Sequence, residues 1–536
     1  MGTLSAAGYR RLGAVGSLAA AVGGIAAGRL PAHDPWGLWV PHGSTTTVAA
    51  AVLAYLGLTL LVVSWWQYGR LVARGAAGGV RDALVTLVWW AAPLALAPPL
   101  HSADVYSYIA QGAMVVEGHD VYTSGPSVIG PDELGADAAA SSGAQWRDTP
   151  APYGPVFLAL AKWVALATDG RIVPAVLGMR LVALAALALI VWATLRIARA
   201  RGADRTGALW LGALNPLLLI HIVGGMHNDG LMIALMLTGL VFALRGRWIL
   251  GSAVVALAMM VKSPAAVALL FVGALVVRRT SGPLPWRVAK AFAVPALVAG
   301  AVAVAATLLS GTGFGWLHTQ SVAGSIHTAL SATSDIGLGV GELTHAAFGW
   351  DSEPVKRAFQ TLGLALALAV IGYAALATFR RVRPWCGDRP PHPVHALGVA
   401  LVALVALSPM VQPWYLLWGT AVVSATAWNG RLGRALSVLS AALVYETHPT
   451  GSTPGYGFLV AGVVCALGTV LLLRERRAAW PWEWPSSADD GARRPGVPLS
   501  GPVRRPSPPL ALPSMRTHGD QGGGPDGEAQ RPTPVR

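Results

Sequence analysis

Long apolar blocks alternate with short polar connections along most of the chain. Many blocks approach the roughly 20 residues that an α-helix needs to cross a bilayer. We therefore expect an all-α integral membrane protein with about fourteen transmembrane helices. The predicted spans lie near residues 12–28, 46–66, 83–100, 173–195, 207–223, 229–244, 248–261, 265–277, 289–309, 355–379, 394–410, 414–428, 434–447 and 456–473.

The arginines gather in alternate connections between these blocks, which predicts the orientation of the chain. By the positive-inside rule, the arginine-rich connections and the N-terminus face the cytoplasm. The long connections 101–152 and 310–354 then face the outside. Residues 153–168 are also apolar, but a further span there would turn the later arginines outward. We expect an interfacial or half-inserted helix instead.

Composition supports a membrane protein, and in a membrane protein a positive net charge does not by itself indicate nucleic-acid binding. Hydrophobic residues make up 54% of the chain and charged residues only 12%, against about 25% charged residues in soluble domains. The net charge of +14 lies in connecting loops, so we expect membrane lipids and no nucleic acid as partners. We expect one membrane domain, residues 1–475, and a disordered cytoplasmic tail, residues 476–536, that is basic and rich in Pro and Gly.

The segment "LHSADVYSYIAQG", residues 100–112, places a carboxylate where an apolar block ends. Asp104 could simply face water or cap a helix. However, Tyr106 and Tyr108 follow it, and Glu117 and Asp120 come soon after. Carboxylates accept hydrogen bonds from sugar hydroxyls, aromatic rings cover the C–H faces of a sugar, and a carboxylate can act as a general base on a hydroxyl.

Two further motifs carry polar groups on the predicted outer side. "PYGP", residues 152–155, is a turn or directs Tyr153 into the same cavity as Asp104. "GGMHNDG", residues 224–230, is a polar turn with a side-chain cap, or it binds a sugar or phosphate through His227, Asn228 and Asp229. One His and one Asp are a weak metal signal, because closed sites need about three or four ligands, and we expect no metal.

Lys262, in "VKSP", is a cation within an apolar region. Such a charge deep in the bilayer costs roughly 2.5–3.5 kcal/mol on insertion scales, so it either snorkels or has an anionic partner, for which a lipid phosphate is a candidate. "QPWY" places Gln412, Trp414 and Tyr415 at a predicted outer interface. These residues form an aromatic belt or a platform on which a sugar stacks.

The order and spacing of "SADVYSY", "YGP", "HNDG", "VKSP" and "QPWY" resemble the polyprenol-phosphate-mannose-dependent α-1,6-mannosyltransferases of actinobacteria, in the GT-C superfamily. The resemblance covers roughly residues 45–475. It implies a GT-C-like helical bundle in the bacterial plasma membrane with its active site on the extracytoplasmic face. The implied donor is polyprenyl-phosphate-mannose, and the implied acceptor is a mannan or glycolipid of the lipomannan type. Asp104 would be the general base.

The chemistry of such a donor agrees with these assignments. A β-linked mannosyl phosphate would give an α-1,6 product by inversion, with Lys262 close to the phosphate. No general acid and no obligatory cofactor are needed, because the phosphate is already a stabilised leaving group.

Two alternatives remain at this level. A GT-C arabinosyltransferase would use polyprenyl-phospho-arabinose in the same geometry, although the chain lacks the large C-terminal carbohydrate-binding domain of some of those enzymes. A polytopic transporter would place ionisable residues near the membrane midplane, often within inverted repeats. Here the polar motifs gather at one predicted face and no repeat is visible. Acceptor length and oligomeric state stay open.

Overall fold

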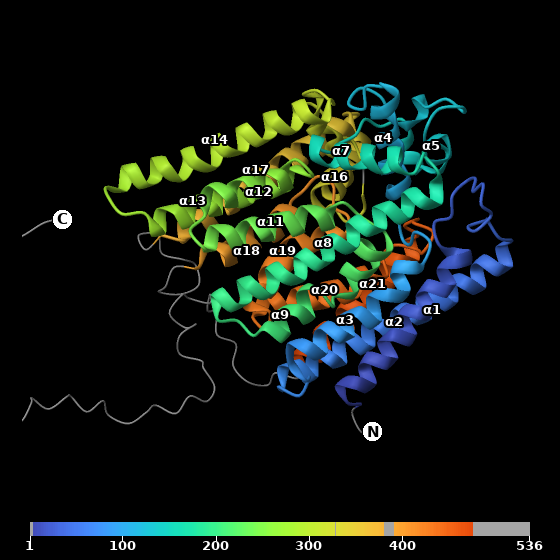
Figure 1. The fold of residues 1–536 in the computed structure, drawn as a ribbon, viewed down its shortest axis with the longest axis horizontal. Coiled ribbons are helices and arrows are strands. Elements are labelled where there is room, and N and C mark those ends of the chain that lie inside the picture. Colours follow the sequence, from blue (N-terminus) through green and yellow to red (C-terminus); the bar gives the residue numbers. More distant parts are fainter. Residues whose placement is uncertain (1–3, 327, 380–390, 475–536) are drawn as a thin grey trace, which may run out of the picture. The chain divides into compact units, whose positions relative to one another are not determined.

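The computed structural model describes residues 4–326, 328–379 and 391–474. Within these ranges the chain forms helices joined by turns and short loops, and no β-strand (Figure 1). The all-α prediction is therefore confirmed for the described residues. The predicted disordered tail, residues 476–536, lies outside them.

Six helices are long and apolar enough to cross a membrane, and a bent pair of helices would make a seventh span. The six are α2 (Ser44–Ala73), α3 (Gly79–Leu96), α8 (Ile172–Arg201), α14 (Leu284–Ser310), α17 (Ser352–Ala377) and α21 (Gly455–Arg474). The bent pair consists of α9 (Arg205–Gly212) and the segment Pro216–Gly224, which meet at 45°. The chain is thus a membrane protein by the length and composition of its helices.

The remaining helices are shorter or less apolar. They are α1 (Ala6–Ala27), α4 (Asp104–Glu117), α5 (Ala136–Ser141), α6 (Ala144–Arg147), α7 (Pro155–Ala167), α10 (Pro216–Leu218), α11 (Asp229–Leu244), α12 (Trp248–Met259), α13 (Val267–Arg279), α15 (Val322–Ser325), α16 (Ala332–Phe348), α18 (Pro393–Ala406), α19 (Leu416–Ala427) and α20 (Arg431–Leu443). Every predicted apolar stretch coincides with helix, so the predicted elements are correct. The predicted number of spans stays a prediction, because several of these helices are short.

Helix α7 illustrates the effect of length. It has 13 residues and is therefore about 20 Å long, since an α-helix rises 1.5 Å per residue. The hydrocarbon core of a bilayer is about 30 Å thick. Helix α7 is too short to cross it unaided, and so are α12, with 12 residues, and α13, with 13 residues, which the sequence predicts to be spans. Length alone therefore does not separate α7 from these predicted spans.

Close helix packing in the N-terminal part depends on glycine. A Cβ atom added to Gly16 of α1 would lie 2.6 Å from the carbonyl oxygen of Gly57 in α2. One added to Gly57 would lie 2.4 Å from the carbonyl oxygen of Gly16. Only hydrogen fits at these positions, which lets the two backbones touch, as small residues commonly do between membrane helices.

Backbone hydrogen bonds gather several chain segments around the start of α4. The amide of Leu100 donates to the carbonyl of Gly224, and the amide of His101 donates to the carbonyl of Pro449. The connection after α3, the turn before α11 and the connection between α20 and α21 therefore meet beside Asp104.

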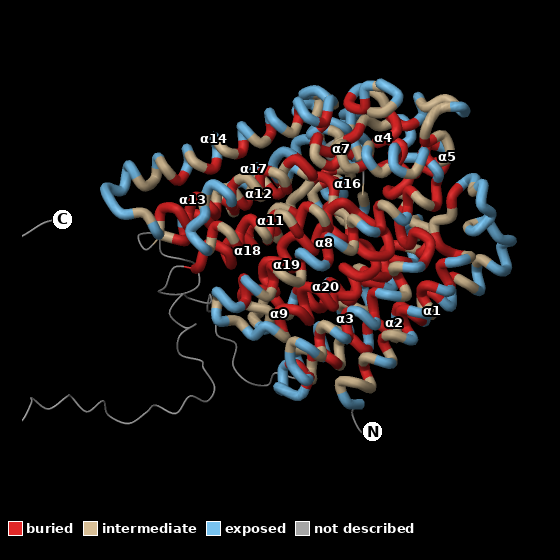
Figure 2. Tube along the Cα trace, viewed as in Figure 1, coloured by how far each residue is buried: buried red, intermediate tan, exposed pale blue. Residues whose placement is uncertain are grey.

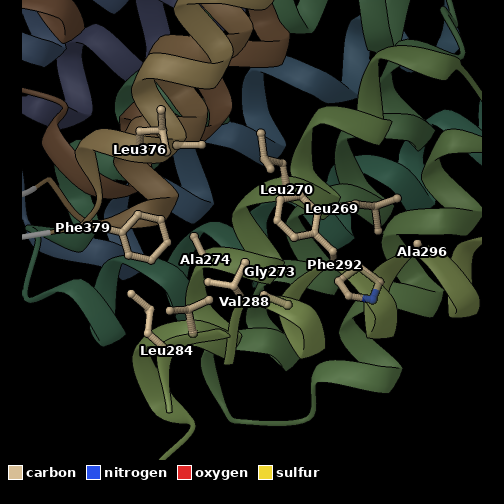
Figure 3. Close-up of a pocket in the computed structure, with 14 residues that line it drawn as sticks. Leu269, Leu270, Gly273, Ala274, Leu284, Val288, Phe292, Ala296, Leu376 and Phe379 are labelled. Carbon is tan, nitrogen blue, oxygen red and sulfur yellow. The ribbon is translucent and has the colours of Figure 1, made fainter. Parts of the chain in front are cut away.

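Burial distinguishes the inner from the outer helices. Figure 2 shows the buried residues concentrated in central segments such as α19, whereas α14 is largely intermediate or exposed. A cavity of about 460 Å³ lies among α13, α14 and the end of α17 (Figure 3). All its lining residues are apolar side chains or glycine, so it offers no side chain that could hydrogen-bond to a sugar. The candidate site lies elsewhere.

Candidate active site

Asp104 is the first residue of α4, and its carboxylate is buried and held from three directions. The indole N–H of Trp146 donates to Oδ1 at 3.0 Å, and the hydroxyl of Tyr108 donates to Oδ2 at 3.4 Å. Nδ1 of His227 lies 3.3 Å from Oδ2. The helix N-terminus also favours a negative charge at this position. These contacts fix the carboxylate in place and keep it ionised.

The surroundings of Asp104 lower the pKa of its carboxyl group. Burial alone would raise this pKa, but the adjacent imidazole of His227, the charge of Lys262 and the indole N–H of Trp146 outweigh it. The pKa therefore lies below its ordinary value. A carboxyl group of this kind is fully ionised at neutral pH and is available to accept a proton.

The backbone on both sides of this carboxylate is strained. His101 has φ of 62° and Met226 has φ of 55°, a left-handed conformation that costs a residue other than glycine of order 1–3 kcal/mol. Residues Leu219–Gly224 form a π-helix, a rare element that is frequent at functional sites. The ring of His227 stacks on Trp414 at a centroid distance of 3.5 Å. The packing thus holds His227 against Asp104 at the expense of local strain.

Several buried polar groups on α4, the π-helix and the turn before α11 have no hydrogen-bond partner among the described residues. They include the amide groups of Gln111 and Asn228 and both ring nitrogens of His221. Buried polar atoms are almost always satisfied by protein, water or a ligand. These groups therefore mark a place where ordered water or a substrate hydroxyl completes the hydrogen bonding.

A polar cavity of about 500 Å³ opens beside Asp104. Its polar lining comes from six separate parts of the chain and includes Arg29, His101, Asp104, Gln145, Thr328, Gln412, Glu446 and Thr447. Trp414 contributes an aromatic face. We call this the Asp104 cavity. Its mixture of carboxylates, amides, hydroxyls and an aromatic ring is suited to a polyhydroxylated ligand.

A second cavity of about 440 Å³ contains Lys262, and we call it the Lys262 cavity. Tyr153, Tyr415 and Trp418 line it together with apolar side chains of α17 and α18. Trp146, whose indole N–H holds Asp104, also lines this cavity. Trp146 therefore connects the two cavities at the carboxylate.

Lys262 has an anionic partner within the protein. Its ammonium lies 3.0 and 2.9 Å from the two carboxylate oxygens of Asp229, and the indole N–H of Trp418 donates to the same carboxylate at 2.6 Å. The ammonium also lies 4.3 Å from the centroid of the Tyr415 ring, a cation–π contact. The sequence left two possibilities for Lys262, snorkelling or an anionic partner. The structure shows the anionic partner, Asp229.

The "PYGP" motif brings α7 against the turn that carries Lys262. A Cβ atom added to Gly154 would lie 2.3 Å from the carbonyl oxygen of Met260. The amide of Val156 donates to that same carbonyl. Tyr153 lines the Lys262 cavity, and its ring contacts that of Tyr108 at a centroid distance of 5.3 Å.

The motif residues thus divide into two groups. Those that line the two cavities or contact Asp104 are Tyr108, Tyr153, His227, Lys262, Gln412, Trp414 and Tyr415. Asp229 belongs with them because it pairs with Lys262. Asn228 is buried beside them.

The other three candidates are used structurally and line neither cavity. The hydroxyl of Tyr106 donates to the carbonyl of Arg29 at 2.6 Å. Glu117 accepts from the amide of Leu134, and Asp120 accepts from the amide of Tyr122. Asp120 lines a separate small cavity with residues 311–315.

Sequence reasoning missed several residues that the fold adds to the site. Trp146 lies in the first long loop without any recognisable motif. Glu446 and Thr447 lie far along the chain, and Nδ1 of His101 is 2.8 Å from the carbonyl oxygen of Thr447 across 346 positions. The only available signal was composition: Glu446 is an acidic residue at the end of an apolar block, as Asp104 is.

Among residues 4–326, 328–379 and 391–474, no group of three His, Cys, Asp or Glu could hold a metal ion.

The comparisons with known proteins give the family. Residues 10–278 match the family described as "Alpha-(1->6)-mannopyranosyltransferase, N-terminal domain", and residues 333–475 match the "MptB C-terminal domain".

Curated relatives extend this match over most of the chain. A Mycolicibacterium smegmatis protein described as a "probable alpha-(1->6)-mannopyranosyltransferase" is 34% identical over 90% of this chain and 92% of its own length. Alpha-(1->6)-mannopyranosyltransferase A of Mycobacterium tuberculosis is 33% identical over 84% and 86%. Alpha-(1->6)-mannopyranosyltransferase B of Corynebacterium glutamicum is 32% identical over 82% and 77%. The chain belongs to the alpha-(1->6)-mannopyranosyltransferase family, and it is a glycosyltransferase.

Proposed function

We propose that this enzyme transfers mannose from polyprenyl-phosphate-mannose to a mannan or glycolipid acceptor of the lipomannan type and forms an α-1,6 linkage by inversion. The observation that carries the proposal is the arrangement of two cavities around one ionised carboxylate. The Asp104 cavity is polar and the Lys262 cavity is amphiphilic. An acceptor glycan suits the first, and a lipid-linked sugar suits the second.

The proposed reaction is supported by the position of Asp104, which lines one cavity and accepts a hydrogen bond from Trp146, a residue that lines the other. The carboxylate of Asp104 takes the proton of an acceptor hydroxyl while the hydroxyl oxygen attacks the anomeric carbon of the mannose. The bond between that carbon and the phosphate oxygen breaks, and the phosphate leaves with the electron pair. Attack opposite to the leaving phosphate converts a β-linked donor into an α-linked product. Trp146 and Tyr108 hold the carboxylate in the required orientation.

Membranes that contain the protein should transfer radiolabelled mannose from polyprenyl-phosphate-mannose to a synthetic α-1,6-linked dimannoside. The product should be α-1,6-linked, and membranes without the protein should give none. Transfer of arabinose from polyprenyl-phospho-arabinose, with none of mannose, would favour the arabinosyltransferase alternative. Absence of transfer from either donor would contradict the proposal.

We also propose that the site faces the outside of the bacterial plasma membrane within a GT-C-like bundle of about fourteen spans. The arginine-rich connections support this orientation. Single cysteines in place of Asp132 and Arg245, both exposed, test it in a chain whose Cys386 and Cys465 are replaced by serine. An impermeant thiol reagent should label the Asp132→Cys protein in intact cells and the Arg245→Cys protein only after lysis. Equal labelling of both in intact cells would refute this topology.

A further inference from the structure

The Lys262 cavity is lined by both apolar and polar residues. The apolar ones come from α17, α18 and their surroundings, namely Pro264, Val322, Ile326, Leu364, Leu404 and Met410. The polar ones include Ser263, Gln320 and Arg357. A lipid phosphate requires this combination, because its chain prefers apolar surroundings whereas its head group needs hydrogen-bond donors and positive charge.

The ammonium of Lys262 does not supply the positive charge that a phosphate needs. Both carboxylate oxygens of Asp229 lie within 3.0 Å of it. The pair is neutral overall, so the buried carboxylate of Asp229 offsets part of the attraction between the ammonium and a second anion. Lys262 keeps a third N–H that can donate a hydrogen bond. The cavity therefore needs another cation to balance a phosphate.

Arg357 is such a cation. It lies near the N-terminal end of α17 and lines the Lys262 cavity. No hydrogen bond or ion pair of its guanidinium occurs within the described part of the chain, whereas the neighbouring Lys356 donates to Glu353 at 2.6 Å. A guanidinium can donate two parallel hydrogen bonds to a phosphate, which makes arginine suited to this contact.

We propose that Arg357 binds the phosphate of the lipid-linked donor and supplies the positive charge that the Lys262–Asp229 pair lacks. This proposal rests on the proposed function for the identity of the donor. Arg357 thereby holds the phosphate of the lipid-linked substrate equally in the ground state and in the transition state. The sugar then extends past Trp146 toward Asp104.

Arg357→Gln tests this proposal, with Arg357→Lys as the conservative variant. Loss of a charge-assisted hydrogen bond of this kind raises the KM for polyprenyl-phosphate-mannose roughly ten- to a hundredfold, with kcat little changed. Arg357→Lys keeps the charge but not the paired donors, so its KM should lie between that of the wild type and that of Arg357→Gln. Arg171→Gln is the matched control, because Arg171 is an exposed arginine before α8 and lines neither cavity.

A binding measurement separates this proposal from the proposed function. Purified protein in detergent is titrated with radiolabelled polyprenyl phosphate, which requires no turnover. The wild type and Arg171→Gln should bind equally, and Arg357→Gln should bind roughly ten- to a hundredfold more weakly. Unlabelled polyprenol, which has no phosphate, should not compete. Equal binding by Arg357→Gln and the wild type would overturn the role of Arg357, whatever the outcome of the transfer assay.

Discussion

Replacement of Asp104 by Asn should reduce mannosyl transfer by about 10²–10⁴-fold, the typical cost of losing a general base. The amide has nearly the same size as the carboxylate, and its oxygen can still accept from Trp146 or Tyr108. The variant should therefore fold and bind polyprenyl phosphate normally. It cannot take the proton of the acceptor hydroxyl, so the loss should appear in kcat. The measurement is single-turnover transfer with both substrates saturating.

The pH dependence of the wild type gives an independent check. Because the pKa of Asp104 is lowered by its surroundings, the carboxylate stays ionised, and this group should not limit activity until the pH falls below about 4, the ordinary value for aspartate. His227→Asn removes one neighbour that lowers this pKa and should move the acidic limb upward. Near-normal transfer by a well-folded Asp104→Asn protein would rule out this base, and Glu446 of the same cavity would be the next candidate.

The second large effect should be on stability. Lys262→Met leaves the carboxylate of Asp229 buried without its cation, and breaking a buried pair in this way costs about 3–5 kcal/mol. We therefore expect a marked fall in the Tm of the detergent-solubilised protein. The double variant Lys262→Met/Asp229→Leu should recover most of that loss, because it removes both charges together.

The pair formed by Lys356 and Glu353 is the matched control for this experiment. The side chains of Lys356 and Lys262 are similarly buried, but that of Glu353 is 48% exposed whereas that of Asp229 is fully buried. Water can therefore solvate Glu353 when its cation is removed, and pairs with an exposed partner contribute about 0–1 kcal/mol. Lys356→Met should therefore change the Tm little. If Lys262→Met were as stable as Lys356→Met, the Lys262–Asp229 contact would not be a buried ion pair of the kind described. Because replacement of Lys262 also destabilises the fold, variants of Arg357 test phosphate binding more clearly than variants of Lys262 do.

The helices of this chain could be predicted from sequence because apolar blocks of helical length leave the backbone one favourable conformation in a bilayer. The motif around Asp104 was recognisable because a carboxylate at the end of an apolar block is unusual. The motifs with His227 and Trp414 could be identified, but not their stacking. That contact depends on the π-helix and on the left-handed Met226, for which no local sequence rule exists.

Long-range partners set the limit of sequence reasoning. Trp146 is 42 positions from Asp104, and Trp418 is 189 positions from Asp229. Nothing in either tryptophan's neighbours indicates these hydrogen bonds. The pairing of Lys262 with Asp229, in contrast, could be inferred from the order of the helices. Asp229 begins α11, and Lys262 follows α12, so two consecutive antiparallel helices place both residues at the same end.

The position of this ion pair has a consequence for the biogenesis of the protein. Asp229 begins the α11–α12 hairpin and Lys262 follows it, 33 positions later in the chain. The antiparallel helices bring the two residues together at the same end. If each helix entered the membrane separately, each charge would have to cross the apolar interior alone, at a cost of roughly 2.5–3.5 kcal/mol on insertion scales. A hairpin that enters as one unit carries the two charges together as a neutral pair. The contact that shapes the candidate active site therefore also favours concerted insertion of these two helices.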